Sequence, residues 1–228
     1  MKNKIIILLT LLPILTNCAS DKIIPLSQND SSIISGKTIA IIHGETPSFM
    51  ATTPKNMTFA LLTGGIAGAA MMVHNGNKIV KNNQIEDPSY LIARNLSNEF
   101  KSKYNAQIID KGLEEKTSNN IDKISEQYRN VADYALDVNT AGWGIIYIRF
   151  NVNHYITQYG TRLRLIDLKN ARIIAEGSCH KTGSKREIEN PPTYDELLND
   201  NAKILKEELT NAAIACTNLY KETALTVK

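Results

Sequence analysis

Residues 154–179, HYITQYGTRLRLIDLKNARIIAEGSC, predict two long strands and the turn that joins them. In the first strand, Leu163 and Leu165 alternate with arginines, and this period of two places the leucines together on one face. The polar residues 167–172 predict the hairpin turn, in which Asn170 suits a left-handed backbone conformation. An antiparallel pair of strands is therefore the centre of the predicted fold.

The elements around this hairpin predict an α/β (α+β) fold with a mixed, largely antiparallel sheet, helices packed on it and a closing C-terminal helix. Asp87 and Pro88 are a typical N-cap and first residue of a helix. Thr193 and Glu196 form a capping box at the start of the closing helix. The other predicted elements are strands at 36–42, 106–110 and 134–150, the last interrupted at 142–144, and a weaker helix at 121–130.

Two short motifs resemble a known periplasmic superfamily. Residues 36–41, GKTIAI, are similar to its opening strand, and residues 164–175, RLIDLKNARIIA, are similar to its hairpin. This superfamily includes the curli-secretion lipoprotein and the N-terminal domain of TolB. The resemblance implies the same arrangement of sheet and helices. It also implies a protein that acts by assembling, as a secretion channel, a scaffold or an activator of cell-wall enzymes.

The first twenty residues, MKNKIIILLTLLPILTNCAS, predict an export signal. Lys2 and Lys4 precede an apolar run at 5–15, which is too short to span a bilayer core of about 20 helical residues. The run ends in Leu-Thr-Asn-Cys, which resembles the lipobox of bacterial lipoproteins, although Asn17 stands where Gly, Ala or Ser is usual. That resemblance implies a signal peptide at 1–17 and an acylated Cys18; the alternative is an ordinary signal peptide cleaved nearby.

The residues after Cys18 predict an address and a tether. No aspartate follows the cysteine, because Ala19 and Ser20 come next, and in sorted lipoproteins this implies the periplasmic face of the outer membrane. The sequence to residue 35 is polar, so residues 18–35 are predicted to be an acylated cysteine and a polar tether. Residues 36–228 then form a single periplasmic domain.

The mature chain keeps two cysteines, Cys179 and Cys216. An even count in an oxidising compartment indicates a disulfide, and the alternative is two buried free thiols. Cys216 lies on the apolar stripe of the closing helix, where a cysteine of the last strand could meet it. Closing such a loop contributes about 3 to 4 kcal/mol in the chain-entropy model.

Residues 59–73, FALLTGGIAGAAMMV, form the most unusual segment of the mature chain because they carry no charge. Ala60, Gly64 and Gly68 fall at i, i+4 and i+8, so a single helix would present a stripe of small residues that lets another helix approach closely. A helix of this length reaches only about 22 Å, short of a hydrocarbon core of about 30 Å. Two interpretations remain open: a segment buried in the domain, or a contact with a membrane or with a partner's helix.

The sequence predicts no catalytic constellation, no cofactor and no metal site. The four histidines are scattered at no metal-ligand spacing, and strand alternation places Asp137 and Asp167 on a solvated face. A net charge of +3 gives no indication of nucleic-acid binding.

We therefore expect a non-catalytic outer-membrane lipoprotein that is a structural or assembly component of a cell-envelope complex, such as a secretion apparatus. Its partners are the membrane and envelope proteins in a homo- or hetero-oligomeric assembly. The alternative is a periplasmic regulatory module that binds cell-wall enzymes or peptidoglycan.

Overall fold

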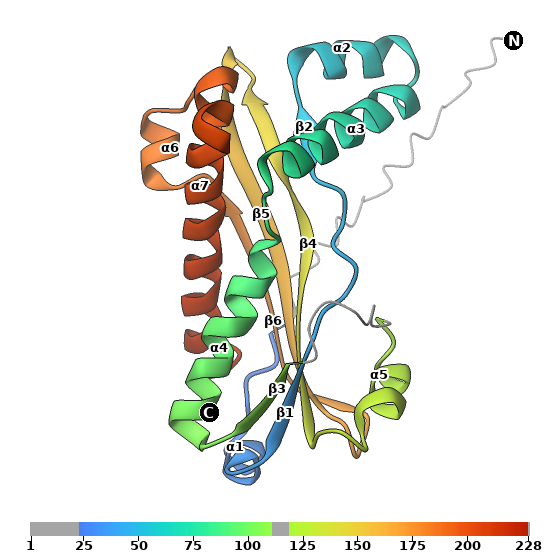
Figure 1. The fold of residues 1–228 in the computed structure, drawn as a ribbon, viewed down its shortest axis with the longest axis vertical. Coiled ribbons are helices and arrows are strands. Elements are labelled where there is room, and N and C mark those ends of the chain that lie inside the picture. The colour runs from blue at the N-terminus through green and yellow to red at the C-terminus, as the bar shows by residue number, and fades with distance from the viewer. Residues whose placement is uncertain (1–22, 111–118, 228) are drawn as a thin grey trace, which may run out of the picture.

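The computed structural model describes residues 23–110 and 119–227, and it contains a six-stranded sheet with the strand order β3-β1-β4-β5-β6 (Figure 1). Strand β1 runs parallel to both β3 and β4, the short β2 also runs parallel to β4, and the β4–β5 and β5–β6 pairs are antiparallel. The strands are β1 (Thr38–Ile42), β2 (Met50–Thr52), β3 (Gln107–Asp110), β4 (Tyr134–Ile148), β5 (Asn151–Asp167) and β6 (Arg172–Thr182). The predicted mixed, largely antiparallel sheet is confirmed.

Helices cover both faces of this sheet. The long helices α4 and α7 pack against each other and against the main core, while α5 covers the opposite face near the β5–β6 turn (Figure 1). The helices are α1 (Gln28–Ile34), α2 (Pro54–Leu62), α3 (Ile66–Asn83), α4 (Pro88–Tyr104), α5 (Ile121–Tyr128), α6 (Lys185–Glu189) and α7 (Tyr194–Glu222).

The predicted helix starts are confirmed by their capping contacts. The Asp87 side chain accepts a hydrogen bond from the Ser89 amide, with Pro88 as the first helical residue of α4. Thr193 and Glu196 form the reciprocal capping box that begins α7. The backbone of α7 departs from helical geometry at residues 199–202, where a kink divides it.

The two sheet turns differ in detail from the prediction. The chain reverses between β4 and β5 at Arg149 and Phe150, directly before the turn predicted at residues 151–153, and those three residues belong to β5. Between β5 and β6 the positive φ belongs to Ala171, at 48°, and not to Asn170. Asn170 instead donates its amide N–H and its side-chain N–H to the Asp167 carboxylate, which caps the turn.

The disulfide joins the edge strand to the closing helix. Cys179 of β6 and Cys216 of α7 are bonded, with their Cα atoms 5.6 Å apart, and both side chains are buried in the main core. The apolar stripe of α7 faces β6, as its spacing predicts, and the two cysteines meet at that contact.

Residues 23–35, the strap, are packed on the domain, so the predicted polar tether at 18–35 is wrong for this part. Ile24 exchanges two backbone hydrogen bonds with Glu176 of β6, at 2.8 and 2.9 Å. Leu26 and Ile34 are fully buried, and the burial of these two apolar side chains helps to hold the strap on the domain. Arg172 donates a hydrogen bond of 2.6 Å to Asp30 of α1, which fixes the strap to the start of β6.

The predicted signal peptide and Cys18 lie outside the described residues. Within residues 23–110 and 119–227, no helix is both long and apolar enough to cross a membrane.

Candidate functional site

Helices α2 and α3 form a hairpin, the arm, which extends away from the sheet at one end of the molecule (Figure 1). The uncharged residues 59–73 are therefore two helices and a turn, not one segment. Gly64 and Gly65 make the turn with φ angles of 74° and 96°, in the left-handed region that glycine adopts at little cost. The predicted single-helix stripe is accordingly wrong, because Gly64 lies between the helices.

Two members of that stripe do meet, across the hairpin. Gly68 of α3 lies so close to Ala60 of α2 that a β-carbon on Gly68 would overlap the Ala60 side chain. Gly64 has open space around it. The small residues thus allow two helices of the same chain to approach each other. The sequence spacing had indicated an approach to the helix of a partner.

The base of the arm is fixed to β2. Gly76 faces the carbonyl of Phe49 with no room for a side chain, and the Asn77 side-chain oxygen accepts the Phe49 amide at 3.2 Å. Asn56 donates its side-chain N–H to the Ala51 carbonyl at 3.0 Å and is almost fully buried. These contacts order the arm where it leaves the sheet.

The far end of the arm is exposed and apolar. Leu61 and Leu62 are each 79% exposed, Ile66 is 85% exposed, and Phe59 is also exposed; these four residues are the apolar tip. Burial in the domain, one of the two open interpretations of this segment, is therefore wrong for the tip. Clustered exposed apolar side chains of this kind mark a surface that contacts a membrane or another protein.

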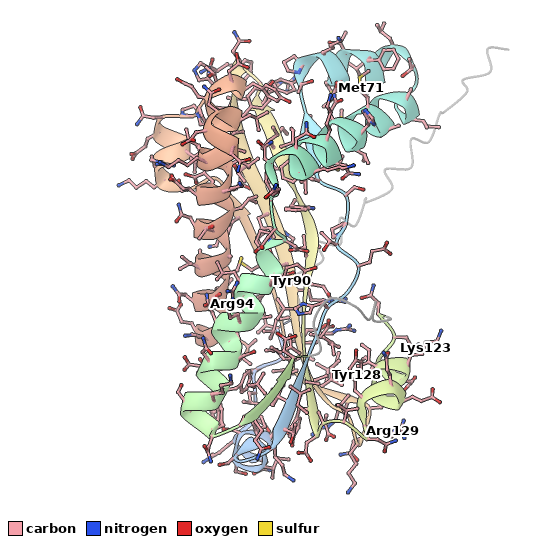
Figure 2. The ribbon with its side chains drawn as sticks, viewed as in Figure 1. Met71, Tyr90, Arg94, Lys123, Tyr128 and Arg129 are labelled. Carbon is pink, nitrogen blue, oxygen red and sulfur yellow. A yellow bond between two sulfur atoms is a disulfide. The ribbon has the colours of Figure 1, made fainter. Side chains whose placement is uncertain are left out.

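A fifth exposed apolar residue lies at the same end of the sheet. Phe150, 96% exposed, sits in the β4–β5 turn, and Figure 1 shows this turn at the same end of the molecule as the arm. The α5 helix lies at the other end, as Figure 2 shows by the labels of Met71 on the arm and Lys123 on α5. The exposed apolar side chains of the arm and of Phe150 therefore share one end of the molecule.

The arm is basic as well as apolar. Residues 46–85 contain Lys55, Lys78 and Lys81 but no aspartate or glutamate. All three lysines are exposed, and none lies between residues 56 and 77. The arm therefore has an uncharged outer part and carries its positive charges toward its base.

Asp137 and Asp167 are buried, so their predicted place on a solvated face is wrong. Asp137 is 2% exposed and forms an ion pair with Arg164, its register partner on β5. Burial raises the pKa of Asp137, and the Arg164 guanidinium opposes that shift. Pairing of this kind gives the aspartate a structural role, since its charge is held by a neighbour on the sheet.

One buried carboxyl group was not singled out by sequence reasoning. Glu187 of α6 is 1% exposed, and it accepts hydrogen bonds from the amide and hydroxyl of Thr157 at 2.9 and 2.8 Å. It borders a cavity of about 690 Å³ between α6 and α7. Burial raises the pKa of Glu187, and the carboxylate of Glu208 adds to that effect. Within the described ranges, no three His, Cys, Asp or Glu residues are grouped so that they could hold a metal ion.

No family model matches this chain, and no curated protein does. Similar solved structures include the C-terminal domain of LpoB from Salmonella enterica, at 15% identity and a TM-score of 0.31, over 68% of this chain and 95% of that one. The PelC dodecamer from Paraburkholderia phytofirmans is 11% identical with a TM-score of 0.30, over 85% and 93% of the two chains. Lipoprotein GNA1162 from Neisseria meningitidis is 12% identical with a TM-score of 0.26, over 78% and 98%. Likenesses at these scores establish neither a family nor a function for this chain.

Proposed function

We propose that this chain is a non-catalytic lipoprotein, acylated at Cys18, that serves as a structural or assembly component of a cell-envelope complex such as a secretion apparatus. The observation that carries the proposal is the strap, because it brings the folded domain close to the proposed anchor. The lipobox resemblance and the absence of an aspartate after Cys18 support the outer membrane as its location.

The strap limits how far the domain can move from the membrane. The stretch from Cys18 to Ile24 spans at most about 20 Å, since an extended chain covers roughly 3.4 Å per residue. Beyond Ile24 the chain is bonded to the domain: Ile24 pairs with Glu176, and the Leu26 amide donates to the Ala224 carbonyl at 2.8 Å. Two or three acyl chains at Cys18 would anchor this short segment in the membrane, because each buried methylene contributes about 0.8 kcal/mol to membrane binding.

This geometry favours an assembly at the membrane over the alternative, a regulatory module that reaches cell-wall enzymes or peptidoglycan. A free tether to residue 35 would allow a reach of nearly 60 Å, again at roughly 3.4 Å per residue. Packing of the strap removes about two thirds of that reach. A domain held this close to the bilayer is placed to act on partners at the membrane surface.

Detergent extraction followed by cross-linking and size analysis tests the proposal. The matched variant carries a flexible Gly/Ser linker of about 20 residues between Ser20 and Asp21, which adds roughly 25 Å of mean reach without touching the domain. We expect most of the wild-type protein to be found in a large, stable assembly. We expect a smaller fraction of the linker variant to be found in that assembly. A wild-type monomer captured with a cell-wall synthase or with glycan would support the alternative instead.

A further inference from the structure

We infer that the apolar tip of the arm inserts into the interfacial region of the membrane that holds Cys18, so that the domain is held at two points and has one orientation. The occupant we assign to the tip is an anionic lipid surface. This inference rests on the proposed acylation of Cys18.

The strap at Ile24 is directed toward the end of the molecule that carries the arm. Ile24 pairs with Glu176 in the antiparallel sense, so the backbone at this bridge, followed toward the N-terminus, points to the C-terminal end of β6. That end of β6 is level with the arm: Thr182 pairs with Gln158, Gln158 with Gly144, and Gly144 with Met50 of β2. From Glu176 to Thr182 is about 20 Å at roughly 3.4 Å per residue, which matches the reach from Ile24 back to Cys18.

The backbone of the arm's turn is partly bonded within the turn itself. The amide of Gly65 donates to the Ala60 carbonyl at 2.7 Å, and the amide of Thr63 donates to the Phe59 carbonyl at 3.0 Å. The hydroxyl of Thr63 donates to the same Phe59 carbonyl at 2.8 Å. The first amides of α3 follow Gly65 without a side-chain cap, so the turn suits the interfacial region, where water and headgroups can bond these amides, and not the hydrocarbon core.

The charge of the arm favours contact with anionic lipid headgroups over contact with an uncharged surface. Lys55 lies in the first turn of α2, and Lys78 and Lys81 lie near the end of α3, so all three are closer to the base of the arm than to its tip. An arm that carries lysines and no acidic residue is attracted as a whole to an anionic membrane surface. Neither α2 nor α3 spans a bilayer, so the tip enters the interface and does not cross it.

The test uses the full mature, acylated protein in vesicles of phosphatidylethanolamine and phosphatidylglycerol. A single reactive thiol, Leu62→Cys, carries an environment-sensitive fluorophore, because Cys18 is acylated and Cys179 and Cys216 are bonded to each other. The matched control is Lys123→Cys on α5, which is exposed and lies at the opposite end of the molecule (Figure 2). Lipids with a nitroxide on the acyl chain report contact with the hydrocarbon boundary.

We expect a blue shift and several-fold stronger nitroxide quenching at position 62 than at position 123. Replacing phosphatidylglycerol with phosphatidylcholine should reduce the quenching at 62. Equal quenching at both positions would overturn the inference. So would a probe at 62 that is shielded from lipid and water alike and cross-links to another chain, since a protein would then cover the tip.

Flotation with the vesicles separates this inference from the proposed function. A wild-type protein that does not float lacks its anchor, and the proposed function fails. A protein that floats while the probe at 62 stays in water keeps its anchor, and only the inserted tip is rejected.

Discussion

Gly68 of α3 lies against Ala60 of α2 with no space for a β-carbon between them. This contact joins the two helices of the arm near their turn, at the point from which the apolar tip is exposed. The arm's shape therefore depends on a glycine that sequence spacing had assigned to the surface of a single helix.

Gly68→Leu should open the arm without unfolding the domain. Overpacking at such a contact costs about 1 to 3 kcal/mol, so amide exchange in α2 should accelerate by roughly ten- to a hundredfold. Ala70→Leu adds bulk at an exposed position of the same helix and should leave exchange unchanged. Hydrogen exchange of α2 compared with β4 and β5 measures the effect, and unaltered protection of α2 in the Gly68 variant would refute the contact.

Removal of the disulfide should lower the stability of the whole domain. Cys179→Ala combined with Cys216→Ala removes a bridge across a sequence separation of 37 residues. The expected loss is about 2 to 5 kcal/mol in the free energy of unfolding. Denaturant titration measures it. If both cysteines of the unreduced wild-type protein can be alkylated completely after denaturation, the bridge is absent and the prediction fails.

The strap should loosen in acid. Burial alone raises the pKa of Asp30, but hydrogen bonds from Arg172 and Ser27 outweigh it and leave that pKa below its ordinary value. A carboxyl group with a lowered pKa in the folded state contributes stability above its unfolded pKa, near 3.9, and that contribution is lost as the pH falls through the folded value. Proteolysis of the strap should therefore rise below about pH 4 in the wild type. Asp30→Asn should show no such dependence on pH; parallel curves for the two proteins would argue against the ion pair.

Glu187 should have the opposite dependence on pH. Its pKa is raised by burial, so its contribution to stability is fully present below the unfolded pKa, near 4.3, and is lost as the pH rises through the folded value. Glu187→Gln keeps an oxygen for the Thr157 hydrogen bonds and removes the charge. As the pH rises from about 4 to 8, the melting temperature of the variant should increase relative to that of the wild type. A raised carboxyl pKa lies in this range. A constant difference would contradict the raised pKa.

Local signals in the sequence were sufficient for much of the fold. The Asp87 and Thr193 caps, the alternation of Leu163 and Leu165, and the position of Cys216 on an apolar stripe all depend on residues close in sequence. Each of these features could be predicted because its partner, or the pattern that defines it, lies within a few positions.

The remaining features depend on distant residues. Leu26 is fully buried, and the strap around it is bonded to Glu176 and Ala224, which come some 150 to 200 positions later. The strap therefore resembled a tether in the sequence, despite the cap from Ser27 to Asp30. Strand alternation assigned Asp137 to one face of the sheet. It could not show that Arg164 and neighbouring elements bury the Asp137 side chain on that face. Likewise, the apolar composition of residues 59–73 did not reveal whether they are buried, because exposure depends on how the arm leaves β2.

Metabolic labelling with a fatty-acid analogue tests the central claim, the anchor at Cys18, most directly. We predict that the wild-type protein takes up the label and that Cys18→Ser takes up none and remains unprocessed or leaves the membrane fraction. Label that persists on Cys18→Ser, or a wild-type protein that never acquires it, would contradict the account.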